Sequence, residues 1–96
     1  MPVPGRYFGW SDGPGAQQIT FRYLGGGIRD VTIGGNVVAR WVPVTHGSGK
    51  VLAGSTRIRF RWRGGHRVEG MIQRGRGRRT QTRRFTAEHR FRDRVL

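Results

Sequence analysis

The chain has 96 residues, 34% of them hydrophobic, with no cysteine and a formal net charge of +14. This length suits one small domain, and the lack of cysteine excludes disulfides and thiolate metal sites. No stretch approaches the roughly 20 consecutive apolar residues of a membrane span. The first ten residues, MPVPGRYFGW, lack the apolar core of a signal peptide, so we expect a virion or cytoplasmic location.

Residues 1–16 are rich in proline and glycine, and we interpret them as an N-terminal arm. Beyond them apolar and polar side chains alternate, which is the period of a β-strand. Three such runs are separated by glycine turns: residues 17–24, 28–33 and 37–44. Pairing Ile19 with Ile33 and Phe21 with Val31 keeps the apolar side chains of the first two runs on one side. Pro43 favours an edge position for the third run.

Residues 45–55 have the composition of a loop. Their segment HGSGK resembles the end of a phosphate-binding P-loop, but Val44 stands where that motif needs glycine and Val51 where it needs Ser or Thr. We therefore interpret it as a plain turn.

The stretch TRIRFRWR places Arg57, Arg59, Arg61 and Arg63 at alternate positions, with Ile58, Phe60 and Trp62 between them. A hairpin to residues 67–73 through a three-residue loop places Trp62 opposite Val68, Arg61 opposite Glu69, Phe60 over Gly70 and Ile58 opposite Ile72. A two-residue loop would mix the two faces. The pattern therefore predicts an arginine row on the outward face of a strand.

The last third begins with a basic Arg-Gly segment, residues 74–82, which we expect to be a loop. Residues 83–91 resume the alternation and predict a final strand, although an amphipathic helix over 84–95 stays open. Residues 92–96 form a basic tail.

Four stretches resemble short β-sandwich modules of actinobacterial secreted proteins: GRYFGW with its Gly-x-Tyr-x-Gly pattern, ITFRYLGGGIRDVTI, GHRVEGMI and TRRFTAEHR. The likeness covers about residues 5–91 and implies a β-sandwich. Those modules usually carry a cysteine pair, whereas the corresponding regions here, ARWVPV and RRTQT, have none. The family implies no general activity.

The charge is uneven, because residues 1–56 carry five basic and two acidic groups while residues 57–96 carry fourteen and three. A basic surplus of this size attracts polyanions. The candidate partner-binding or nucleic-acid-binding residues are Arg57, Arg59, Arg61, Arg63, Arg74, Arg76, Arg78, Arg79, Arg83 and Arg84. The alternative is a merely solvated basic face.

Catalytic residues, metal ligands and cofactors are not predicted. His46, His66 and His89 lack the spacing of a metal site, and His89 falls on an apolar face. The five acids are scattered and the three serines fall in loops, so neither a carboxylate pair nor a nucleophile with its base is indicated.

These observations predict an all-β fold, a small antiparallel β-sandwich or barrel of six or seven strands with a basic face. The function expected first is a non-enzymatic, multi-copy accessory protein of a large assembly, such as a virion shell or tail, that docks by its arginines onto acidic subunits. A small core without cysteine and a proline-rich arm favour it. The alternative is sequence-tolerant binding to the DNA or RNA phosphate backbone. No membrane partner is expected.

Overall fold

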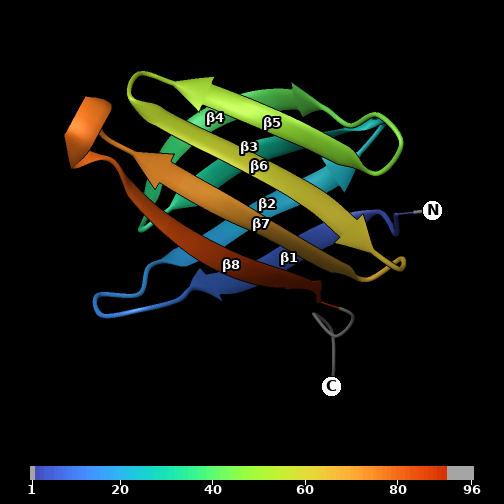
Figure 1. The fold of residues 1–96 in the computed structure, drawn as a ribbon. Helices are drawn as coiled ribbons and strands as arrows, with labels where there is room; N and C mark the ends of the chain where they lie inside the picture. Colours follow the sequence, from blue (N-terminus) through green and yellow to red (C-terminus); the bar gives the residue numbers. More distant parts are fainter. Residues whose placement is uncertain (1, 91–96) are drawn as a thin grey trace.

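A computed structural model describes residues 2–90 of the chain as one antiparallel sheet of eight strands (Figure 1). The strands are β1 (Gly5–Ser11), β2 (Gln18–Leu24), β3 (Gly27–Ile33), β4 (Asn36–Pro43), β5 (Ser48–Ala53), β6 (Thr56–Arg63), β7 (Arg67–Arg74) and β8 (Gln81–His89). One short 3-10 turn, η1 (Gly77–Arg79), precedes β8. The fold is all-β, as the alternation predicts.

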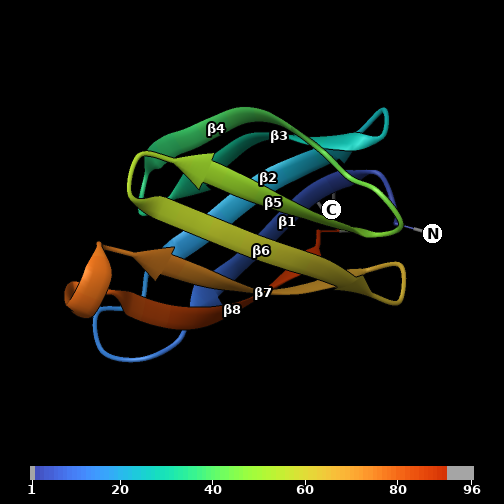
Figure 2. The same cartoon turned by 45° about the horizontal axis from the view of Figure 1, so that its top comes forward.

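The strand order is β4-β3-β2-β1-β8-β7-β6-β5, so every neighbouring pair is consecutive in the chain except β1 and β8. The protein therefore consists of two four-stranded meanders, β1–β4 and β5–β8, joined where β1 pairs with β8. The sheet curls into a nearly closed barrel that brings its edge strands β4 and β5 to the same side (Figures 1 and 2). No hydrogen-bonded ladder joins β4 to β5 in the described part of the chain.

The core lies inside this barrel and is built from the inward residues of both meanders. Aromatic rings form its centre: Tyr7 stacks on Phe21 with ring centroids 5.3 Å apart and meets Trp62 edge-on at 5.4 Å. Tyr7 belongs to β1 and Trp62 to β6, so these contacts tie the two meanders together.

One end of the barrel is closed by hydrogen bonds around Tyr7. Trp62 Nε1 donates to the Tyr7 hydroxyl at 3.0 Å, and that hydroxyl lies 2.7 Å from the Val3 carbonyl and 3.0 Å from the Gly65 carbonyl. The Val3 amide also donates to Gly65 at 2.9 Å. Burial raises the pKa of Tyr7 above its usual 10.0, because an ionised hydroxyl is poorly solvated there.

The register predicted for the β6–β7 hairpin is confirmed: Trp62 pairs with Val68, Arg61 with Glu69, Phe60 with Gly70 and Ile58 with Ile72. One detail is wrong. The ring that covers Gly70 belongs to Phe85, whose Cε2 lies 2.5 Å from where a Gly70 Cβ would be, while the Phe60 ring covers Gly49 instead.

The β2–β3 pairing is confirmed in part. Ile19 lies opposite Ile33, but the register shifts beyond Thr20, where Asp30 has a φ of +49°, so the predicted Phe21–Val31 pair does not form. Both side chains are nevertheless buried. Pro43 ends β4, which is an edge strand as predicted.

The structure has eight strands instead of the predicted six or seven, because the sequence pattern did not indicate β1 and β5. The presumed arm, residues 1–16, contains β1, which lies mid-sheet between β2 and β8. Inward positions of β1 include Gly9, and a Cβ there would lie 1.8 Å from the Thr86 carbonyl oxygen, so only glycine fits and the apolar alternation is lost. The presumed loop 45–55 likewise contains β5, whose inward residues are Gly49, Val51 and Ala53.

The presumed loop 74–82 is shorter than predicted, since β7 runs through Arg74 and β8 starts at Gln81, with η1 between them. For residues 84–95 the strand is confirmed through His89, where β8 ends. Residues 91–95 of that range, and the basic tail 92–96, lie outside the described residues.

Candidate functional site

The outward face of β5–β8 carries the predicted arginine row on β6. Arg57, Arg59, Arg61 and Arg63 are all exposed, whereas the residues between them point into the core. The neighbouring strand β5 places its own outward residues beside this row: Ser48 opposite Arg61, Lys50 opposite Arg59, and Leu52 opposite Arg57. Successive arginines along β6 repeat at roughly 6.5–7 Å, twice the rise of a strand residue.

Glu69 on β7 is the acid nearest this row, and its ion pairs lie at one end. Its carboxylate lies 3.1 Å from Arg63 Nε and 3.7 Å from Arg67 Nε. No ion pair involves the other cations of the row, Arg57, Arg59, Arg61 and Lys50, within residues 2–90. Four exposed cations of this face thus have no ion pair with its acids among the described residues, which favours a polyanionic partner.

The remaining predicted site residues are not all on this face. Arg84 is outward on β8 opposite Met71, and Arg76, Arg78 and Arg79 are exposed around η1 beyond the end of the sheet. Arg74 is half-buried at the last position of β7.

Arg83 was predicted to belong to the binding site, and the structure contradicts this. It lies opposite Ile72 on the inward side of β8, and its Nη1 donates to the carbonyls of Asp12 at 2.9 Å and Pro14 at 2.6 Å. The Arg84 amide, in turn, donates to the Asp12 carboxylate at 3.0 Å. Arg83 thus holds the β1–β2 connection at the second end of the barrel, and its charge is used within the molecule.

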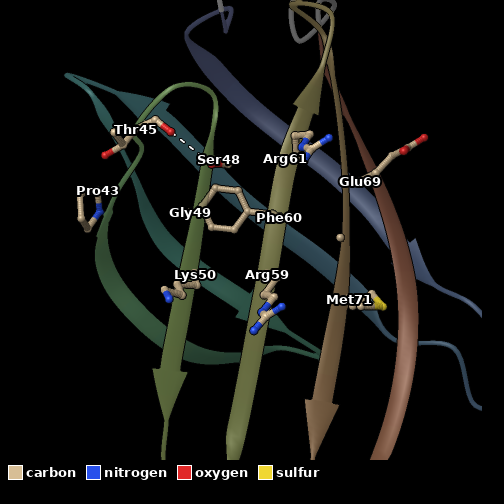
Figure 3. Close-up of a pocket in the computed structure, with 11 residues that line it drawn as sticks. Pro43, Thr45, Ser48, Gly49, Lys50, Arg59, Phe60, Arg61, Glu69 and Met71 are labelled. Atoms are coloured by element: carbon tan, nitrogen blue, oxygen red, sulfur yellow. Dashed lines mark hydrogen bonds between the residues drawn. The ribbon is translucent and has the colours of Figure 1, made fainter.

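A groove of about 580 Å³ crosses the outward face of β5, β6 and β7 (Figure 3). One wall is the row Ser48, Arg61 and Glu69, and the other is the row Lys50, Arg59 and Met71. Between the two walls lies a third row: Gly49, Phe60 and Gly70. The two glycines have no side chain and that of Phe60 points into the core, so the backbone of this row forms the floor of the groove. Pro43 and Thr45 close the β5 end.

Basic side chains also lie on the other meander, so the expectation of a single basic face is only partly right. Exposed arginines outside β5–β8 and η1 are Arg6, Arg22, Arg29, Arg40 and Arg90. Arg29 lies over the Trp41 ring at 5.4 Å and Arg90 over the Phe8 ring at 4.4 Å. The charge is densest on β5–β8 but continues around the barrel.

Sequence reasoning missed four residues of the face: Lys50, Leu52, Arg67 and Met71. Lys50 and Leu52 fell in the presumed loop, and nothing in SGKVLA other than the Val51 position indicates a strand. Arg67 and Met71 could have been predicted from the sequence, because the confirmed hairpin register places every second residue of β7 outward beside an arginine of β6.

No family model, curated protein or solved structure matches this chain. The resemblance to Gly-x-Tyr β-sandwich modules therefore stays a prediction. Residues 2–90 contain no group of three or more potential metal ligands and no helix able to cross a membrane. The interpretation of HGSGK as a plain turn is only partly right: His46 and Gly47 form a turn with positive φ, whereas Ser48, Gly49 and Lys50 already belong to β5.

Proposed function

We propose that the protein is a non-enzymatic docking module that binds acidic protein subunits through the outward face of β5–β8. The observation that carries this proposal is the group of four cations without ion pairs, Lys50, Arg57, Arg59 and Arg61, on one rigid sheet face. Arginine binds carboxylates bidentately, so a row of guanidinium groups spaced along one strand suits a surface of Asp and Glu side chains.

Apolar side chains among these cations favour a protein partner over nucleic acid. Leu52 is 72% exposed and Met71 is 42% exposed, and each lies opposite an arginine of β6. Protein–protein interfaces are enriched in Arg and Met. By contrast, the three aromatic rings of β5–β8, Phe60, Trp62 and Phe85, are buried in the core and offer no platform for base stacking.

The wider role proposed is that of a multi-copy accessory protein of a large assembly, of the virion shell or tail type, acting in the virion or the cytoplasm. A small domain with one dense cationic face suits attachment to a repeating acidic lattice. Binding to the DNA or RNA backbone is the second candidate, because phosphates are attracted by the same cations.

The test compares two quadruple variants with equal charge changes. In the first, Arg57, Arg59, Arg61 and Arg63 become Gln; in the second, Arg6, Arg22, Arg29 and Arg40 become Gln on the other meander. Binding of labelled poly-L-glutamate and of single- and double-stranded DNA is measured by fluorescence anisotropy between about 50 and 200 mM salt.

The proposal expects poly-L-glutamate to bind the wild type and the second variant, and to lose most of its affinity for the first. Equal losses in the two variants would show that only net charge matters and would contradict a specific face. Tighter binding of DNA, with a loss of about a thousandfold across the salt range, would establish the nucleic-acid function instead. If neither poly-L-glutamate nor DNA bound at the lowest salt concentration, both the acidic-protein function and the nucleic-acid function would be contradicted.

A further inference from the structure

The groove across β5, β6 and β7 differs from the rest of the face in shape as well as charge. Its floor is main chain, since Gly49, Phe60 and Gly70 direct nothing outward, and side chains two residues apart on each strand form its walls. Three strands at about 4.8 Å spacing give it a length of roughly 10 Å, enough for three or four residues of extended chain.

The charges within the groove are unequal at its two ends. Lys50 lies on β5, and Arg59 and Arg61 lie on β6 on either side of Phe60 (Figure 3), and the lining residues of these two strands include no acid. The β7 end has Met71 on one wall and Glu69 on the other. Glu69 is engaged by Arg63 and Arg67, but its carboxylate still disfavours a second anion there.

We propose that this groove binds an extended acidic peptide segment that lies across the strands, with a carboxylate over Arg59, Arg61 and Lys50 and an apolar side chain over Met71. This inference rests on the proposed function and specifies its ligand. Side chains on one side of an extended segment repeat at about 6.5–7 Å, so the acidic and the apolar residue are two positions apart.

The two arginines supply the strongest contacts. Guanidinium groups on both sides of a groove hold a carboxylate by charge-assisted hydrogen bonds, and Lys50 adds a third donor from β5. Met71 is flexible and polarisable, which suits a contact with apolar side chains of differing shape. The sequence preference expected is an acidic residue and an aliphatic residue two positions apart.

The test measures the binding of two labelled peptides of equal length and net charge by anisotropy at constant salt. In the first, a leucine stands two positions before and another two positions after the acidic residue; in the second, the same residues are scrambled so that no leucine keeps that spacing. The proteins are the wild type, the groove double variant R59Q/R61Q, and the matched control R57Q/R84Q, which removes two outward arginines of the same face that do not line the groove.

The groove variant is expected to lose on the order of tenfold to a hundredfold in affinity for the first peptide, and the control about threefold or less. A third variant, Met71→Ser, is expected to abolish the preference for the first peptide over the scrambled one without reducing affinity for the scrambled one.

Equal losses in R59Q/R61Q and R57Q/R84Q, with no preference between peptides in the wild type, would overturn the groove while leaving docking by the whole face intact. Unchanged peptide binding in both double variants, together with unchanged poly-L-glutamate binding in the four-arginine variant of β6, would overturn both proposals.

Discussion

The two meanders are built alike inside the barrel and differently outside it. Both bury aromatic and β-branched side chains, with Tyr7 and Phe21 from one meeting Phe60 and Trp62 from the other. Outside, β5–β8 presents seven basic and two acidic side chains: Lys50, Arg57, Arg59, Arg61, Arg63, Arg67, Arg84, Glu69 and Glu88. The strands β1–β4 expose only four arginines, Arg6, Arg22, Arg29 and Arg40, and one acid, Asp30.

This difference shows that the barrel itself does not require the charges. The outward residues of β1–β4 instead include the exposed rings of Trp10 and Trp41, and that meander completes the same core with fewer cations. A fold that tolerates either surface leaves the outward pattern free to serve binding.

The largest effect on stability is expected where β1 and β8 join the meanders. Gly9→Ala places a Cβ 1.8 Å from the Thr86 carbonyl oxygen and 2.6 Å from the Ala87 Cα, both main-chain atoms that cannot move without opening the ladder. We expect a loss of about 3 kcal/mol in the free energy of unfolding, measured by urea denaturation.

Gly27→Ala is the matched control for that change. Its Cβ also meets a close neighbour, but this is the Trp41 ring, which is 47% exposed and free to swing away. A loss below about 1 kcal/mol is expected. Equal losses in the two variants would contradict the view that β1–β8 is the rigid junction.

The next effect concerns Tyr7, which hydrogen-bonds across the meanders. Tyr7→Phe removes the hydroxyl that accepts the hydrogen bond from Trp62 Nε1, so we expect a loss of about 1–3 kcal/mol in the free energy of unfolding at neutral pH. Because the folded pKa of Tyr7 is raised, its contribution to stability is complete below pH 10 and declines as pH rises toward the folded pKa.

The wild type should therefore lose stability above about pH 10, and the Tyr7→Phe variant should lose much less over the same range. Chemical denaturation at a series of alkaline pH values checks this. Tyr23→Phe, which removes the other tyrosine, should still lose stability at alkaline pH. If the Tyr23→Phe variant kept its stability there, Tyr23 and not Tyr7 would be the source of the effect.

A smaller effect distinguishes two adjacent arginines of β8. Arg83→Gln removes both bonds to the β1–β2 connection and should reduce the free energy of unfolding by about 1–2 kcal/mol. Arg84→Gln, whose side chain is outward, should change it by less than about 0.5 kcal/mol. Thermal unfolding of the two single variants gives the comparison. A larger loss of stability in Arg84→Gln than in Arg83→Gln would contradict the structural role of Arg83.

The smallest effect on stability is expected from the arginine row. Changing Arg57, Arg59 and Arg61 to Gln removes like-charge repulsion without breaking an ion pair, so a gain of only about a few tenths of a kcal/mol at low salt is expected. Salt screening should erase that gain. A clear loss of stability at every salt concentration would show that these arginines serve the fold.

The hairpin of β6 and β7 shows how far sequence reasoning reaches. Its register followed from the requirement that Ile58, Phe60 and Trp62 share a side with Val68 and Ile72, and the structure has that register. The same reasoning missed β1 and β5, because glycines at Gly9 and Gly49 replace the apolar side chains that mark an inward position. It also grouped Arg83 with the outward arginines, although the alternation of residues 83–91 puts Arg83 on the same side as the inward Phe85 and Ala87.

The sequence by itself determined the all-β class, the outward arginine row and the absence of disulfides, because side-chain alternation and residue type are local properties of the chain. Only the tertiary structure decided that β1 pairs with β8, that Arg83 holds the β1–β2 connection, and that Lys50 and Met71 join Arg59 and Arg61 around one groove. These arrangements depend on close approaches between residues far apart in the chain, and the ring of Phe85 over Gly70 is typical of them. Such contacts form only where one residue, like Gly70, is small enough to leave room for the side chain that the curled sheet brings beside it.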